Sequence, residues 1–347
     1  MELTMRWFGP ADPVQLWQLR QIPNLGGVVT ALHDVAPGEA WTLETIQGLR
    51  QRVEAAGLHL SVIESIPIHE DIKLGNARAD ERIQGFLQSL RAVAGAGVRT
   101  VCYNFMPVFD WTRTDLTHLR PDGSTGLSFR QAEVDQLRIG VGDLSLPGWA
   151  EAYTPDELAK LRSAYTDVDA PALRRNLVAF LQAVVPEAAR LGVKLALHPD
   201  DPPWPVLGLP RVVSTAEDLR FVLDAVPDEH SGLTFCLGSL GARADNDLLA
   251  MIEEFAPRIH FVHARNVERV GERDFDEVAH VSRFGSTGLA AAVMRLEDLR
   301  PSVPVRPDHG RMIWGETGRP GYGLYDRALG AMYLQGLIDA VRERRNP

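Results

Sequence analysis

The sequence predicts an α/β protein built on a (β/α)8 TIM barrel, with a long insertion after the fourth strand. Three observations support this prediction. Eight short apolar runs recur along the 347 residues, helix-like stretches separate them, and most runs are continuously apolar rather than alternating. Continuous apolar runs are typical of parallel strands that are covered on both faces. An open, doubly wound sheet is the structural alternative, because strand spacing alone does not exclude it.

The eight runs are rich in Val, Ile, Leu and Phe. In chain order they cover residues 3–9, 27–34, 58–65, 98–105, 193–200, 232–239, 259–266 and 303–310. Gly57, Gly97 and Gly192 stand just before three of these runs, as expected where a helix ends and the chain turns back. Ser214 and Glu217 have the spacing of a capping box, which predicts that a helix begins there.

The connection between the fourth and fifth runs is much longer than one crossover helix needs. Its first part is rich in turn formers and aromatic residues, and Asp169 with Pro171 then indicates the start of a helix. Loops after barrel strands lie at the catalytic mouth, so we expect the insertion, residues 106–170, to cover the active site. A surface decoration or a subunit contact is the alternative. Because no linker divides the sequence, residues 1–347 are expected to form a single catalytic domain.

Composition favours a cytoplasmic protein with a small-molecule partner. The formal net charge of −10 disfavours a broad nucleic-acid or anionic-membrane surface. We see no signal peptide and no apolar run near the roughly 18 residues of a membrane span. Cys102 and Cys236 lie in strand-like runs and fit a reducing compartment better than a disulfide framework. We expect a homo-oligomer that binds neither nucleic acid nor membrane.

Each of the last four runs ends with a side chain that can bind a metal: His198, Cys236, His263 and Asp308. Barrel enzymes place their chemistry at the carboxyl ends of the strands, and neighbouring strands lie about 5 Å apart. Taken singly, each histidine is more often structural, the cysteine more often packing, and the aspartate often a turn cap. Their repetition at equivalent positions predicts one metal site. Two imidazoles, a thiolate and a carboxylate suit Zn²⁺, Fe²⁺ or Co²⁺ by softness, so composition leaves the metal open.

Two residues near this predicted site are candidates for proton transfer. His309 directly follows Asp308, and a histidine beside a metal site is a ready acid or base. Tyr322 lies in the Gly-rich stretch that follows, although an aromatic packed on the barrel rim is the alternative for it. The glycines there match neither of the nucleotide-binding loop patterns.

Several stretches together resemble the mannonate dehydratase family. They are MRWFG, GVVTALHDV, VIESIPIHEDIKLG, VCYNFMPVFDWTRTDL, LALHPDDPPWP, HFVHARN and RPDHGRMIWGE followed by GYGLYDRALG. The resemblance implies a barrel related to xylose isomerase that dehydrates D-mannonate to 2-keto-3-deoxy-D-gluconate in hexuronate (glucuronate) catabolism. It implies Mn²⁺ as the usual metal. Fe²⁺ is the second choice, because a catalytic ion must expand its coordination to bind substrate and both ions do so readily. It assigns metal binding to His198, Cys236, His263 and Asp308 and proton transfer to His309 and Tyr322, with Tyr325 close enough to compete for the tyrosine role.

Substrate binding is expected from residues at or just beyond the fourth strand. Asn104 is expected to bond substrate hydroxyls, Arg113 to pair with the substrate carboxylate, and Trp111 to line the same region. Local loop structure is the alternative for each. Rival functions are a metal-dependent sugar isomerase or epimerase on the same barrel, a nuclease acting on damaged DNA, and a non-catalytic sugar-acid binding protein.

Overall fold

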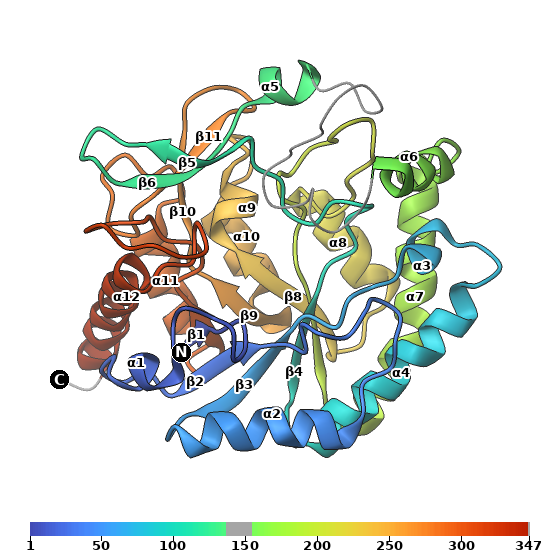
Figure 1. The fold of residues 1–347 in the computed structure, drawn as a ribbon, viewed down its shortest axis with the longest axis horizontal. Coiled ribbons are helices and arrows are strands. Elements are labelled where there is room, and N and C mark those ends of the chain that lie inside the picture. Colours follow the sequence, from blue (N-terminus) through green and yellow to red (C-terminus); the bar gives the residue numbers. More distant parts are fainter. Residues whose placement is uncertain (137–154, 346–347) are drawn as a thin grey trace.

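Eight parallel strands close into a barrel in the computed structural model, which describes residues 1–136 and 155–345 (Figure 1). Around the barrel the strands follow the order β1–β12–β9–β8–β7–β4–β3–β2. Their bounds are β1 Glu2–Arg6, β2 Gly27–Thr30, β3 His59–Glu64, β4 Thr100–Tyr103, β7 Lys194–Leu197, β8 Ser231–Cys236, β9 Ile259–His263 and β12 Pro304–Arg306. Each overlaps one predicted run, so the closed barrel is confirmed and the open sheet is wrong.

Helices surround the barrel, with α2, α4 and α7 on one side and α11 and α12 on the other (Figure 1). Their bounds are α1 Leu16–Arg20, α2 Leu43–Ala55, α3 Glu70–Leu74, α4 Ala79–Gly95, α5 Gln131–Gln136, α6 Pro155–Ala164, α7 Ala170–Leu191, α8 Ala216–Ala225, α9 Leu237–Gly241, α10 Leu248–Phe255, η1 Ala256–Arg258, α11 Leu289–Leu299 and α12 Leu324–Arg345. Gly57, Gly97 and Gly192 have φ of 75°, 86° and 65°, the left-handed values expected after a helix. Within the described ranges, no helix combines the length and apolar character that a membrane crossing needs.

The start of α8 differs by one residue from the expectation. The capping box is formed by Thr215 and Asp218, not by Ser214 and Glu217. The Thr215 hydroxyl accepts from the Asp218 backbone N–H at 3.2 Å. The Ser214 hydroxyl is engaged elsewhere, because it donates to a carboxylate oxygen of Asp200 at 2.9 Å. The usual pattern has Glu or Gln three residues after the cap, so Thr215 with Asp218 is a variant of it. Ser214 does not cap the helix, because its hydroxyl is bonded to Asp200.

A second, antiparallel sheet that the sequence did not reveal stands beside the barrel (Figure 1). Its strands, in the order β10–β11–β6–β5, are β5 Asp115–Leu119, β6 Thr125–Phe129, β10 Asn266–Arg269 and β11 Phe275–Val278. Two come from the insertion and two from the segment after β9, so the sheet joins parts of the chain about 150 residues apart. Residues 137–154 of the insertion lie outside the described residues. At its far end Asp169 caps α7 by accepting from the Ala172 N–H at 2.8 Å, as predicted.

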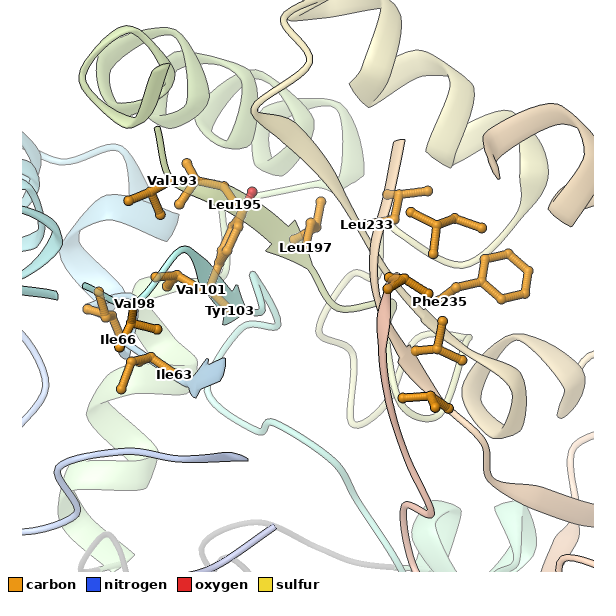
Figure 2. Close-up of a cluster of buried hydrophobic side chains, with 14 of the residues drawn as sticks. Ile63, Ile66, Val98, Val101, Tyr103, Val193, Leu195, Leu197, Leu233 and Phe235 are labelled. Atoms are coloured by element: carbon orange, nitrogen blue, oxygen red, sulfur yellow. The ribbon is translucent and has the colours of Figure 1, made fainter. Parts of the chain in front are cut away.

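Side chains along each barrel strand alternate between two environments. Val101 and Tyr103 of β4 pack outward with the helices, where the Tyr103 and Phe180 rings lie 5.8 Å apart, and Figure 2 shows them in the same apolar cluster as side chains of β7 and β8. A separate cluster made only of strand residues fills the barrel interior: Val29, Val62, Cys102, Ala196 and Phe261. Because the period is two, Glu64, Asn104, His198 and His263 share the inward face of their strands, one step nearer the carboxyl ends.

Candidate metal centre and active site

The four side chains predicted as metal ligands lie together at the carboxyl ends of four neighbouring strands. His198 Nε2 and His263 Nδ1 are 3.1 Å apart. The Oδ2 atom of Asp308 lies 3.7 Å from His263 Nδ1 and 3.8 Å from Cys236 Sγ. Ligand atoms of His198, Cys236 and His263 all lie within 4.8 Å of one another. The cluster therefore has two imidazole nitrogens, a sulfur and a carboxylate oxygen facing one small space.

Neighbouring groups orient two of these side chains for metal binding. His198 Nδ1 lies 2.7 Å from the carbonyl oxygen of Pro199, which can only accept, so Nδ1 carries the hydrogen and Nε2 offers its lone pair to the cluster. The backbone N–H and the hydroxyl of Ser239 lie 3.4 and 3.1 Å from the sulfur of Cys236. These two contacts hold the sulfur in place beside the other three side chains. The donor set fits a divalent ion.

Asp308 is held by a buried arginine at the end of β12. Arg306 contacts Asp308 through Nη1 and donates to both oxygens of Glu64, at 2.8 and 3.1 Å. Burial alone would raise the pKa of Asp308 and of Glu64, but the charge of Arg306 beside them holds both pKa values well below their ordinary range. Both carboxyl groups are therefore ionised. Asp308 is left with Oδ2 directed at the cluster.

Glu64 also belongs to a second possible metal group, with Cys102 and His263. Its oxygens, however, already accept from Arg306, and Arg6 Nη1 lies 3.4 Å from one of them. Burial, followed by the charge of Glu64, raises the pKa of the Cys102 thiol well above its ordinary value. A protonated thiol and a carboxylate already paired with arginine are poor ligands, so the geometry favours the cluster that contains Cys236.

The predicted proton-transfer pair lies beside this cluster. His309 Nε2 is 2.9 Å from the hydroxyl of Tyr322 and 3.8 Å from Asp308 Oδ1. On the other side of the ring, His309 Nδ1 is 2.8 Å from each carboxylate oxygen of Glu277, in β11. Burial, followed by the charge of Asp308, raises the pKa of Tyr322 above its ordinary value. The phenol therefore keeps its proton and serves as a donor. Tyr325, the competing tyrosine, is 43% exposed and packs against Trp314 instead.

The insertion reaches this pair through Trp111 and Arg113. The Trp111 ring packs edge-on against the His309 ring, with centroids 5.4 Å apart. Arg113 is fully buried, and its guanidinium donates to both oxygens of Asp201, at 2.9 and 3.0 Å, and to Glu277 Oε1 at 2.6 Å. The structure thus brings Trp111 into contact with His309, and Arg113 into contact with Glu277, the partner of His309. The guanidinium of Arg113 is shared by the carboxylates of Asp201 and Glu277.

A cavity of about 480 Å³ lies at the ends of the first four barrel strands. Its lining includes Asn104, Arg6 and His33. The cavity adjoins the metal-capable cluster, because Arg6 contacts Glu64 and Glu64 lies 3.5 Å from His263 Nε2. Burial, followed by the charge of Arg6, lowers the pKa of His33 to about 4. Arg6 therefore stands in the cavity beside a neutral imidazole, and its Nε has no hydrogen-bond partner within residues 1–136 and 155–345.

Sequence reasoning missed Glu64, Glu277 and Arg306, and also Arg6, the last residue of β1. Glu64 and Arg306 each interrupt an apolar run near its carboxyl end, and a charged residue at that position was a usable signal. Glu277 had no such signal, because the short strand FDEV does not show a buried apolar run. Its importance depends on a tertiary contact with a residue 32 positions away.

The fold and the side chains at its mouth define a (β/α)8-barrel protein with a candidate metal centre. The family model for D-mannonate dehydratase (UxuA) matches residues 1–346. Mannonate dehydratase 2 of Halalkalibacterium halodurans is 49% identical over 343 residues, which cover 98% of this chain and 99% of that protein. The chain belongs to the D-mannonate dehydratase family and is a hydro-lyase.

Two solved structures show how far the likeness extends. The crystal structure of mannonate dehydratase from Streptococcus suis serotype 2 matches with a TM-score of 0.93 and 43% identity, covering 99% of this chain and 96% of that one. A D-psicose 3-epimerase matches with a TM-score of 0.57 and 12% identity, covering 98% and 99%. The second likeness shows the shared barrel alone, so it lends no support to an epimerase activity.

Proposed function

We propose that the chain catalyses the metal-dependent dehydration of D-mannonate to 2-keto-3-deoxy-D-gluconate. The observation that carries this proposal is the hydrogen-bonded pair of His309 and Tyr322 beside Asp308. Asp308 in turn adjoins the metal-capable group of His198, Cys236 and His263. Removing water from a sugar acid needs charge stabilisation and two proton transfers, and this arrangement has groups for both. The name of the 49% identical relative supplies the substrate.

For the metal, we propose His198, Cys236, His263 and Asp308 as the ligands of one divalent ion, Mn²⁺ first and Fe²⁺ second. The orientation of His198 by Pro199 and of Asp308 by Arg306 supports this ligand set. A proton on the carbon beside a carboxylate is very weakly acidic. When bound, the ion supplies positive charge that stabilises the negative charge left on the substrate after that proton departs.

For proton transfer, we propose that His309 takes the C2 proton and that Tyr322 protonates the departing C3 hydroxyl. Glu277 accepts from His309 Nδ1, so the lone pair of the ring is on Nε2, while the buried phenol of Tyr322 keeps its proton. The electron pair of the C2–H bond forms the C2–C3 double bond as the C3–O bond breaks. The departing hydroxide takes the phenol proton and leaves as water. The enol then tautomerises to the ketone. The 2.9 Å hydrogen bond lets the proton on His309 return to Tyr322.

For substrate binding, we propose that the cavity beside the cluster holds the sugar chain, with Asn104 in its lining and Trp111 packed on His309. A role for Arg113 in binding the substrate carboxylate stays a prediction, and its guanidinium is already shared by Asp201 and Glu277. Arg6 is a second candidate for that role, because it lines the cavity and its Nε is without a partner in the described part of the chain.

We further propose that the enzyme works in the cytoplasm, in hexuronate breakdown, as a homo-oligomer. Both cysteines are free and buried, which supports a reducing compartment, and a metal-binding Cys236 needs its thiol reduced. Exposed Trp314 and Phe284 supply apolar surface of the kind that a contact between subunits covers.

The test is product analysis with matched variants. Metal-loaded protein is incubated with D-mannonate and its epimers, and 2-keto-3-deoxy acid is quantified. We expect product from D-mannonate only when metal is present. Cys236→Ala and His263→Ala should lose metal and activity together. His309→Asn and Tyr322→Phe should keep the metal and lose turnover by about 10²-fold or more, the scale for a lost acid or base.

Elemental analysis provides the control, because it separates metal loss from chemical loss. Full metal occupancy in the Cys236→Ala and His263→Ala proteins would contradict the ligand set. Epimerised sugar acid formed without loss of water would instead favour the isomerase or epimerase alternative.

A further inference from the structure

We propose that Glu277 is a positioning residue that fixes the tautomer of His309 and thereby sets the direction of the hydrogen bond to Tyr322. This inference rests on the proposed function, in which His309 and Tyr322 transfer protons. Glu277 lies in β11, outside the barrel strands, so the second sheet would supply a residue that positions the proton-transfer pair.

The hydrogen-bond chain leaves one arrangement for a neutral ring. Both oxygens of Glu277 lie 2.8 Å from His309 Nδ1, and an ionised carboxylate can only accept. The hydrogen of the neutral imidazole is therefore on Nδ1. Nε2 is left with its lone pair, so the Tyr322 hydroxyl, 2.9 Å away, is the donor. With the opposite tautomer, Nε2 would carry a hydrogen and could not receive a proton from substrate or tyrosine.

Glu277 is itself held rigidly by the insertion. Arg113 donates to Glu277 Oε1 through Nε at 2.9 Å and Nη2 at 2.6 Å, and its other contacts fix it to Asp201. Strand β11, which carries Glu277, also pairs with β6 of the insertion. The Trp111 ring lies against the His309 ring, which limits its rotation. Insertion and second sheet together hold the acceptor for His309 in place.

Asp276, the preceding residue on β11, provides a matched control. Like Glu277 it is a buried carboxylate that pairs with arginines of the insertion, at 2.7 Å from Arg120 Nη1 and 2.6 Å from Arg130 Nη2. Because successive side chains of a strand point to opposite faces, Asp276 is directed away from His309. If Glu277 only joined the insertion to the sheet, replacing either carboxylate by its amide would have similar consequences.

Glu277→Gln is expected to reverse the tautomer rather than merely weaken a contact. Arg113 directs two N–H groups at Oε1, so the amide oxygen of glutamine will take that position. The amide NH₂ then takes the Oε2 position, which is also 2.8 Å from His309 Nδ1. Because the oxygen at the Oε1 position already accepts two hydrogen bonds from Arg113, we expect Nδ1 to accept from the amide rather than to donate to that oxygen. The ring hydrogen moves to Nε2, which becomes a donor toward Tyr322. Glu277→Asp keeps the acceptor charge on a shorter arm and is expected to retain the wild-type tautomer.

The test combines a spectroscopic and a kinetic measurement on the full chain. Ring nitrogens of ¹⁵N-histidine-labelled protein, loaded with diamagnetic Zn²⁺, are observed by NMR, with His309→Asn identifying the His309 signals. We expect hydrogen on Nδ1 in the wild type, Asp276→Asn and Glu277→Asp, and on Nε2 in Glu277→Gln. With the active metal, Glu277→Gln should lose about 10²-fold in kcat with little change in KM and full metal content, since a wrong tautomer is costly in His-dependent catalysis. Asp276→Asn should turn over at nearly the wild-type rate.

The two readouts separate this proposal from the proposed function. Retention of the Nδ1 tautomer by Glu277→Gln, or equal kcat losses in Glu277→Gln and Asp276→Asn, overturns the positioning role. Wild-type turnover by His309→Asn overturns the proton-transfer assignment, while the NMR result still reports whether Glu277 fixes the ring. Should Glu277→Gln lose metal or fail to fold, Glu277→Asp decides: a retained Nδ1 signal with partial kcat supports the proposal, and a lost one contradicts it.

Discussion

At the scale of single residues, the candidate site contains charges that are buried and paired. Arg306 is 2% exposed and lies between Glu64 and Asp308, so one guanidinium compensates two carboxylates at the top of the barrel interior. Its planar fork allows this, because three nitrogens point in fixed directions. A buried ion pair adds little net stability compared with well-packed apolar residues of the same size. Removing one partner is nevertheless costly, because the other partner is left buried and charged with no opposite charge beside it.

Replacing Arg306 therefore tests how strongly the site depends on this charge. Arg306→Met should reduce the free energy of unfolding by about 3–5 kcal/mol, the range for breaking a buried ion pair. Arg306→Lys keeps the charge but reaches fewer oxygens, so its loss should be smaller. Urea denaturation followed by tryptophan fluorescence measures both. Arg344→Met, which removes an exposed ion pair with Asp298, is the control and should be nearly neutral. Equal losses for Arg306→Met and Arg344→Met would contradict the argument.

At the scale of secondary-structure elements, the sequence predicts the elements that have a distinctive local pattern of apolar residues. The eight barrel strands are apolar runs that are buried on both sides, and their carboxyl ends indicate where His198, Cys236, His263 and Asp308 meet. The second sheet is different, because β11 pairs with β6 across about 150 residues and neither strand has a distinctive pattern. Glu277 belongs to that sheet, so the sequence does not reveal it as a partner of Arg113 and His309.

The predicted cap of α7 gives a test at this scale. Asp169 accepts from the Ala172 N–H at 2.8 Å, so Asp169→Ala leaves that N–H without its side-chain partner. The expected cost is about 1 kcal/mol in the free energy of unfolding. Asp169→Asn should retain most of the stability, because asparagine caps about as well as aspartate. Asp167→Ala, two residues earlier and exposed, is the matched control for loss of charge. Urea titration measures all three, and a loss as large in Asp167→Ala would show that charge, not capping, is responsible.

At the scale of the whole molecule, the candidate site lies at one end of the barrel, and the opposite end holds a buried histidine that affects stability. The metal-capable cluster, the cavity and the insertion gather at the carboxyl ends of the strands. The opposite end holds His260, at the start of β9, which is 4% exposed. Its imidazole lies so close to Gly232 that any side chain there would collide with it. His260 Nε2 donates to the carbonyl oxygen of Glu229 at 2.9 Å, so the N–H group of the neutral ring has a hydrogen-bond partner at this end of the barrel.

The pH dependence of folding follows from this buried ring. Burial, with added repulsion from Lys194, lowers the pKa of His260 from 6.5 to about 3. Below pH 6.5 the unfolded chain binds a proton at this position and the folded chain does not, so the contribution of His260 to stability is complete above pH 6.5 and declines as the pH falls toward 3. His260→Gln keeps a donor for Glu229 but cannot be protonated. The free energy of unfolding of this variant should therefore fall less steeply than that of the wild type between pH 6.5 and 4.5, when urea denaturation is measured at each pH. Measurement at pH 8, where the imidazole is neutral in both states, gives the packing cost of the substitution alone. Parallel curves for the two proteins would show that His260 is as readily protonated in the folded chain as in the unfolded one.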